Sequence, residues 1–137
     1  MYEIIIATHG PMAEGMKESV KMFCDKTDHI HTICLDEQGI DVFEKKAEAL
    51  IQRIHKEPVL ILCDIGFATP FNVFAKHIED FKSDIEIVAG VNLPALLEAV
   101  ILQEQSTVGE IVVNLKQTIQ SVSLKDQLNA AEHSEDE

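Results

Sequence analysis

Two kinds of hydrophobic pattern alternate along the chain. Short, nearly continuous apolar runs are typical of buried strands, and longer segments with an apolar residue at every third or fourth position are typical of amphipathic helices. The expected strands span residues 3–7, 29–35, 59–63 and 85–91. The expected helices span residues 12–23, 43–54, 69–78, 93–101 and 108–119. This alternation predicts an α/β fold.

The order of these elements predicts a doubly wound, mainly parallel sheet with helices on both faces. Strands joined through helices require right-handed crossovers, and a common order for four such strands is 2-1-3-4. Ligands of such sheets bind beyond the carboxyl ends of the strands where the order reverses, here between the first and third strands. His9 and Asp64 follow these two strands, so we expect their side chains to lie side by side.

Chain length and charge narrow the classes of protein. The chain has 137 residues, which is enough for one domain but short for two. We expect this domain to span residues 1–124, and the acidic residues 125–137 to form a flexible tail. The net charge of −13 argues against nucleic acid and anionic membranes as partners, and it favours a basic protein partner or simply solubility.

The sequence carries no sign of membrane insertion or export. No apolar run approaches the roughly 18 residues that cross a bilayer, and the first residues lack the basic segment of an export signal. We therefore expect a cytoplasmic protein. Cys24, Cys34 and Cys63 form no close pair, so we expect reduced, mostly buried thiols.

His9 and Asp64 have the chemistry of a phosphoryl acceptor. A carboxylate that accepts a hydrogen bond from Nδ1–H of His9 would leave Nε2 as a nucleophile. Helix N-termini are expected after Gly10-Pro11 and at Thr69-Pro70, with Thr69 as N-cap, and both favour a phosphate-like anion. From the residues alone two other readings stay open, namely a structural histidine at a strand end and an aspartate that caps a helix.

The other histidines show no metal-site pattern. His29 and His31 alternate onto one strand face, but the acidic residues near them lack ligand spacing. We expect all five to be surface residues, with His55 and His77 on the solvent side of helices and His133 in the tail, and we predict no metal site. The chain also lacks the glycine-rich motifs of dinucleotide and P-loop sites, so no nucleotide cofactor is indicated.

Three segments together resemble a known family. They read ATHGPMAEG at 7–15, DIGFATPFN at 64–72 and AGVNLP at 89–94. In order and spacing they are similar to the mannose-type IIA domains of the bacterial sugar phosphotransferase system, over nearly the whole chain to about residue 120.

The resemblance implies a phosphohistidine relay without a cofactor. The histidine matching His9 would accept a phosphoryl group from the phosphocarrier HPr and pass it to a histidine of a separate IIB subunit. Asp64 would orient His9, and Gly10, Thr69 and the helix start at Phe71 would bind the phosphate. The family also forms homodimers that exchange a C-terminal edge strand, for which residues 121–124 are the candidate.

One departure from the family pattern and three rival functions accompany this interpretation. The family usually has an aromatic residue and paired glycines after the aspartate, whereas this chain has Gly66-Phe67-Ala68.

On the same fold, the phosphotransfer subunit of a dihydroxyacetone kinase and a non-catalytic regulatory binding module are alternatives. A response-regulator receiver phosphorylated on Asp64 would need an acidic pair after the first strand, where this chain has Thr8-His9.

Overall fold

The structure is a computed structural model that describes residues 1–135, and its centre is a parallel sheet of four strands. The strands lie in the order β2-β1-β3-β4, which confirms the predicted order. All three neighbouring pairs are parallel. The strands span Glu3–His9 (β1), Ile30–Leu35 (β2), Val59–Cys63 (β3) and Ile85–Ala89 (β4).

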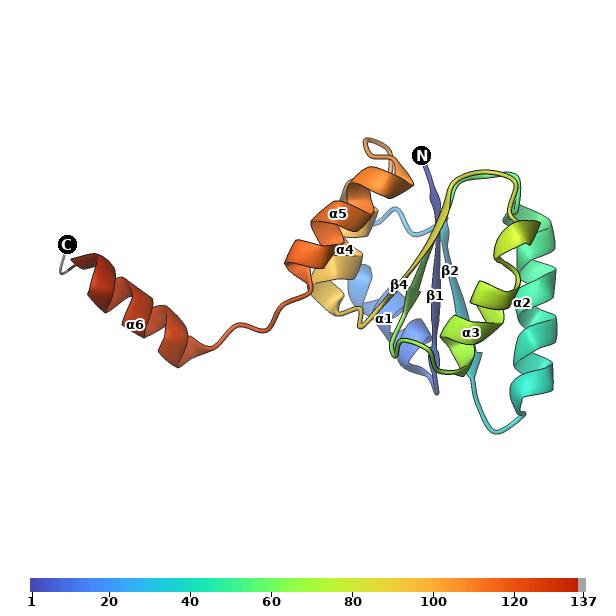
Figure 1. Ribbon diagram of the computed structural model, residues 1–137, viewed down its shortest axis with the longest axis horizontal. Helices are drawn as coiled ribbons and strands as arrows, with labels where there is room; N and C mark the ends of the chain where they lie inside the picture. Colours follow the sequence, from blue (N-terminus) through green and yellow to red (C-terminus); the bar gives the residue numbers. More distant parts are fainter. Residues whose placement is uncertain (136–137) are drawn as a thin grey trace.

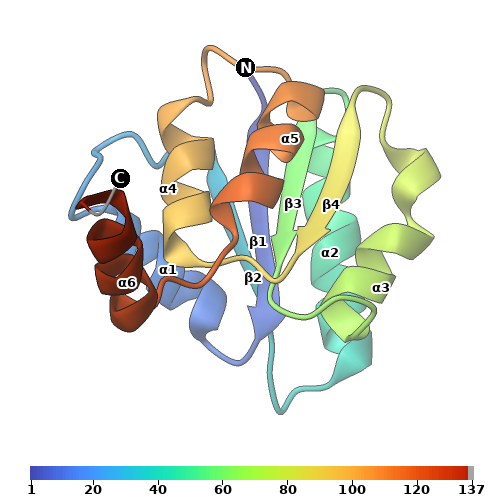
Figure 2. The ribbon, with the colours of Figure 1, turned by 60° about the vertical axis from the view of Figure 1, so that its left-hand side comes forward.

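Helices cover both faces of the sheet (Figures 1 and 2). On one face lie α1 (Met12–Val20), α4 (Leu93–Ile101) and α5 (Val108–Thr118), and on the other lie α2 (Ile40–Ile54) and α3 (Thr69–Lys76). A short 3-10 helix, η1 (Ile78–Asp80), follows α3. Among residues 1–135, no helix has both the length and the apolar character that a membrane span requires.

Side-chain alternation along β1 explains the two-faced core. Ile4 and Ile6 pack with α1, α4 and α5, whereas Ile5 and Ala7 pack with α2 and α3. All four side chains are fully buried. A strand buried on both faces is apolar at every position, which is why the run before His9 shows no polar alternation.

Several elements end earlier than the sequence pattern suggests. The helix expected over residues 12–23 ends at Val20, and Phe23 is 65% exposed instead of lying on the apolar stripe. The fourth strand ends at Ala89 because Gly90 takes a positive φ of 75°, which turns the chain out of the strand. These changes shorten the elements and leave the order of the sheet unchanged.

The C-terminal segment is helical over most of the expected tail. Residues 124–135 form a helix, α6 (Leu124–Glu135), joined to α5 by a linker, and Figure 1 shows it projecting from the body of the domain. Residues 136–137 of the expected tail lie outside the described residues. In the single chain the candidate edge strand at residues 121–124 is not a strand, since residues 121–123 have no regular structure and Leu124 begins α6.

Candidate phosphohistidine site

The structure brings His9 and Asp64 into direct contact at the carboxyl end of the sheet. His9 is the last residue of β1, and Asp64 directly follows β3. Because β1 and β3 are neighbours and Ala7 is paired with Cys63, the two chains leave the sheet side by side. Nδ1 of His9 lies 2.9 Å from Oδ2 of Asp64, as the topology predicted.

Asp64 is held as a hydrogen-bond acceptor from three sides. Its Oδ2 also accepts a hydrogen bond from the backbone N–H of His9 at 3.0 Å, and its Oδ1 accepts one from the N–H of Ile65 at 2.9 Å. Burial of Asp64 acts to raise its pKa. The hydrogen bonds from His9 and Ile65 and the charge of the His9 ring outweigh that effect and lower the pKa below its ordinary value.

These contacts determine which nitrogen of His9 can react. An ionised carboxylate can only accept hydrogen bonds, so Nδ1 of His9 carries a proton, and the lone pair of the neutral ring is on Nε2. The His9 side chain is 40% exposed, compared with 11% for Asp64. A free lone pair on a partly exposed ring, with a partly buried carboxylate on the other nitrogen, is what a nucleophilic histidine requires.

The loop after His9 is shaped by a glycine and by a threonine that the sequence analysis missed. Gly10 takes φ +59°, and its N–H donates to the carbonyl of Leu35 at 2.7 Å. The hydroxyl of buried Thr8 accepts a hydrogen bond from the N–H of Ala13 in the first turn of α1, at 2.8 Å. Thr8 lies three residues before the N-cap, Pro11, and so outside the usual capping position, which is why no capping pattern in the sequence reveals this role.

At the start of α3, the structure corrects the predicted N-cap. The N-cap is Ala68, which has no capping side chain, and Thr69 is the first helical residue. The first helical hydrogen bond runs from the N–H of Asn72 to the carbonyl of Ala68. The N–H groups of Thr69 and Phe71 therefore precede the helical ladder and point out of the helix start, where an anion can bind them.

Phe67 keeps a glycine-like backbone where the family pattern has a glycine. Its φ is +61°, the one positive φ of a non-glycine residue in the described chain. The carbonyl of Phe67 accepts a hydrogen bond from the Asn72 side chain at 2.9 Å, and its ring lies 4.8 Å from that of Phe71. Phe67 is 81% exposed, so the loop after Asp64 presents an aromatic ring to solvent.

Two of the other histidines are less exposed than predicted. The side chain of His31 is 15% exposed and that of His77 is 16% exposed, so neither is a solvent-facing surface residue. His31 is covered because it shares the carboxylate of Glu3 with His29, at 3.3 and 2.7 Å. His77 is covered because α3 ends at Lys76, so the histidine turns back toward α2.

At the carboxyl end of a 2-1-3-4 sheet, a partly exposed histidine ring is hydrogen-bonded to a partly buried aspartate, which is the geometry expected of a histidine phosphoacceptor. A family model described as "PTS system fructose IIA component" matches residues 3–116. The chain therefore belongs to this mannose-type family of IIA components of the sugar phosphotransferase system, as the three sequence segments predicted.

Individual relatives agree with this assignment. The chain is 36% identical to the fructose-specific EIIA component of Bacillus subtilis, over 85% of this chain and 80% of the relative. It is 29% identical to the sorbose-specific EIIA component of Lacticaseibacillus casei, over 82% of each chain. The solved mannose/sorbose-specific IIA subunit of Enterococcus faecalis superposes with a TM-score of 0.79 at 25% identity, covering 90% of this chain and 96% of that one.

Proposed function

We propose that Nε2 of His9 accepts a phosphoryl group from phospho-HPr and passes it to a histidine of a separate IIB subunit during sugar uptake. The observation that carries this proposal is the 2.9 Å contact between Nδ1 of His9 and the partly buried carboxylate of Asp64. That contact leaves the lone pair of the neutral ring on Nε2. Membership of the IIA family supports the same assignment.

The transfer needs no proton movement at His9. The phosphorus–nitrogen bond of the donor breaks as the bond to Nε2 forms, and the donor imidazole leaves with its electron pair. Nδ1 keeps its proton, so positive charge develops on the His9 ring, and Asp64 stabilises that charge in place. In the second half-reaction the acceptor imidazole attacks the same phosphorus, and the neutral His9 ring leaves.

The helix starts around His9 suit the transferred group. The proposed phosphate-binding groups are the backbone at Gly10, the hydroxyl and N–H of Thr69, and the N–H of Phe71. The N–H groups of Thr69 and Phe71 come before the helical ladder of α3, and the positive end of the helix dipole favours an anion. No cofactor is needed in this step, because positioning and charge stabilisation are the main requirements of phosphoryl transfer.

The charge of the chain is consistent with a basic donor. With 24 acidic and 11 basic residues, the surface attracts a basic face of HPr and raises the rate of encounter. This relay belongs in the cytoplasm, where we propose that the protein works with separate HPr and IIB chains.

The test is phosphorylation with the general enzyme of the system, HPr and labelled phosphoenolpyruvate. An acid-labile, base-stable label that maps to His9 and is absent from His9→Ala supports the proposal. His29→Ala is the matched control, because His29 also contacts a carboxylate but lies at the opposite end of the sheet. A base-labile label on Asp64 would indicate a receiver instead, and failure of any carrier to label the chain would favour a non-catalytic binding module.

We further propose that the protein is a homodimer in which residues 121–124 add an edge strand to the partner copy. Support comes from β4, an edge strand that pairs with β3 on one side, and from a groove beside it lined by Val88, Val112 and Ile119. Val122 is 79% exposed in the single chain. Light scattering should give a dimer that Val122→Asp weakens, and a monomer at micromolar concentration would contradict the proposal.

A further inference from the structure

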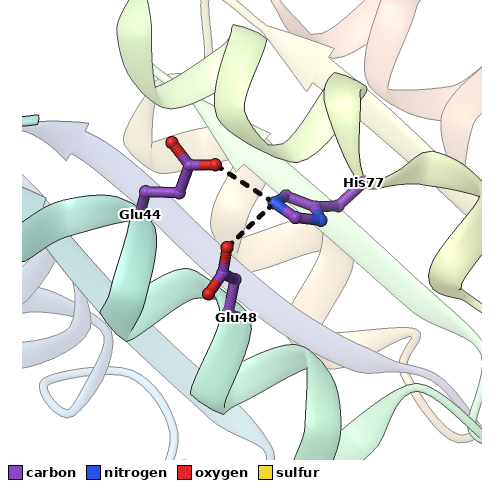
Figure 3. Close-up of side chains that lie close together, drawn as sticks. All are labelled: Glu44, Glu48 and His77. Carbon is purple, nitrogen blue, oxygen red and sulfur yellow. Dashed lines mark ion pairs between the residues drawn. The ribbon is translucent and has the colours of Figure 1, made fainter. Parts of the chain in front are cut away.

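A further histidine–carboxylate cluster lies between α2 and the end of α3, away from His9. Glu44 and Glu48 are one turn apart on α2, and His77 directly follows α3 (Figure 3). One ligand atom from each of the three side chains lies within 4.8 Å of the other two. The cluster therefore joins two helices that are separated in sequence.

The ring of His77 is oriented by a fourth side chain. Its Nδ1 lies 2.8 Å from Oδ2 of Asp80, in the 3-10 helix that follows α3. Since a carboxylate accepts hydrogen bonds, this contact keeps the proton of the neutral ring on Nδ1 and directs the lone pair of Nε2 toward Glu44 and Glu48.

Nε2 of His77 faces two acceptors and has no hydrogen bond of its own. It is buried, and it is the one buried side-chain nitrogen or oxygen without a hydrogen-bond partner among the residues that the structure describes. It lies 3.5 Å from Oε1 of Glu44 and 3.7 Å from Oε1 of Glu48. A lone pair that faces two carboxylate oxygens is complemented by a cation placed between them.

We propose that Glu44, Glu48 and His77 bind a divalent transition-metal ion, with Zn²⁺ as the ion that best fits the donor set. Zinc lies about 2.0–2.2 Å from nitrogen and carboxylate oxygen ligands, so two ligands at tetrahedral angles stand roughly 3.3–3.5 Å apart. The distances from Nε2 to the two oxygens are within a few tenths of an ångström of that separation. Asp80 is then the outer carboxylate that orients the histidine ligand.

The surroundings leave room for further ligands. A surface pocket lined by Glu48, Gln52, His77 and Asp80 opens beside the cluster, so water can complete the coordination. Lys76 is the competitor, since its ammonium group pairs with the same Oε1 of Glu44. The Lys76 side chain is 62% exposed, so it can move into solvent when the ion binds.

A metal ion bound at this cluster would link α2 to the end of α3. The ion would bind the native state and not the unfolded chain, and so would stabilise the fold in proportion to its concentration. The proposal uses no residue of the relay, and its outcome is independent of phosphorylation at His9.

The experiment is calorimetric titration of the tag-free, chelator-treated full chain with ZnCl₂, alongside thermal unfolding with and without the ion. We expect one Zn²⁺ per chain and a rise in Tm of at least about 2–4 °C at saturation. Glu48→Gln is the decisive variant, because Glu48 is 52% exposed and its substitution leaves the fold intact. This variant and His77→Gln should bind at least about tenfold more weakly, and Asp80→Asn should weaken binding by about tenfold through the outer shell.

Two further variants complete the test. The pair His29→Gln with His31→Gln removes the histidine–carboxylate group around Glu3 and should bind Zn²⁺ like the wild type. Lys76→Gln removes the competing cation and should bind more tightly. The proposal is overturned if the wild type shows no saturable binding, if Glu48→Gln binds unchanged, or if the His29 and His31 substitutions abolish binding.

Discussion

Asp64 accepts hydrogen bonds from both the main chain and the ring of His9, and its Oδ2 lies 3.0 Å from the backbone nitrogen and 2.9 Å from Nδ1. One oxygen atom thereby ties the end of β1 to the end of β3 and orients the imidazole at the same time. Asp64 thus sets both the position and the tautomer of the proposed nucleophile, His9. It is therefore the most informative residue to change.

Replacement of Asp64 by asparagine should slow phosphoryl transfer while leaving the domain folded. The amide can still accept the backbone N–H of His9, but it carries no charge to stabilise the phosphorylated ring. We expect the transfer rate to fall about 100-fold, or ~2.7 kcal/mol. Rapid-quench measurement of the transfer from phospho-HPr tests this, with Asp36→Asn as a control on a loop aspartate. An unchanged rate in Asp64→Asn would remove Asp64 from the mechanism.

The same carboxylate should make stability depend on pH in a defined direction. The pKa of Asp64 is lowered in the folded state, so the unfolded chain binds its proton first as the pH falls. The stabilisation is complete above the ordinary aspartate pKa of about 3.9 and is lost as the pH falls through the lower, folded value. Urea unfolding of the wild type and Asp64→Asn should therefore differ most at neutral pH and converge in acid. A difference that grows in acid would contradict this assignment.

Two substitutions of Phe67 should measure how much its left-handed backbone conformation reduces the free energy of unfolding. A β-branched residue at φ +61° is strained, whereas glycine adopts this conformation freely. We expect Phe67→Val to unfold at lower urea concentration than Phe67→Gly, by about 1–2 kcal/mol in the free energy of unfolding. Both variants lose the contact with Phe71, so that contact cancels in the comparison. Equal stability of the two would show that the loop rearranges.

Cys63 should be inert to thiol reagents in the folded protein. It is fully buried, and burial together with the charge of Asp64 raises the pKa of its thiol to about 12. Cys24 and Cys34 are half-buried, so they should react first. Titration with a chromogenic disulfide should detect the third thiol in denaturant and not in buffer. Fast reaction of Cys63 under native conditions would mean that this end of β3 opens readily.

The pairing of His9 with Asp64 could be predicted from the sequence because it follows from topology. Apolar runs before both residues identify neighbouring buried strands, and the strand order then brings their ends together. The short-range details could not be predicted in this way. A phenylalanine seldom takes a positive φ, so nothing in its residue type indicates the backbone of Phe67.

The burial of His77 shows how a small boundary error changes the chemistry. The apolar stripe predicts that the third helix continues to residue 78, which places His77 on a solvent-facing turn. The α-helix ends at Lys76 instead, and the chain tightens into a 3-10 turn. That change turns the ring toward Glu44 and Glu48, and no pattern of hydrophobic residues reports on it.

The hydrogen bond at Nδ1 leaves Nε2 as the one ring nitrogen of His9 with a free lone pair, and this has a kinetic consequence. Nδ1 is occupied by Asp64, so any protein that exchanges a phosphoryl group with His9 must reach the same nitrogen from the same side. Two proteins cannot occupy that footprint together. In the relay proposed above, donor and acceptor would therefore bind His9 alternately, which gives ping-pong kinetics. A high concentration of either partner would then inhibit binding of the other.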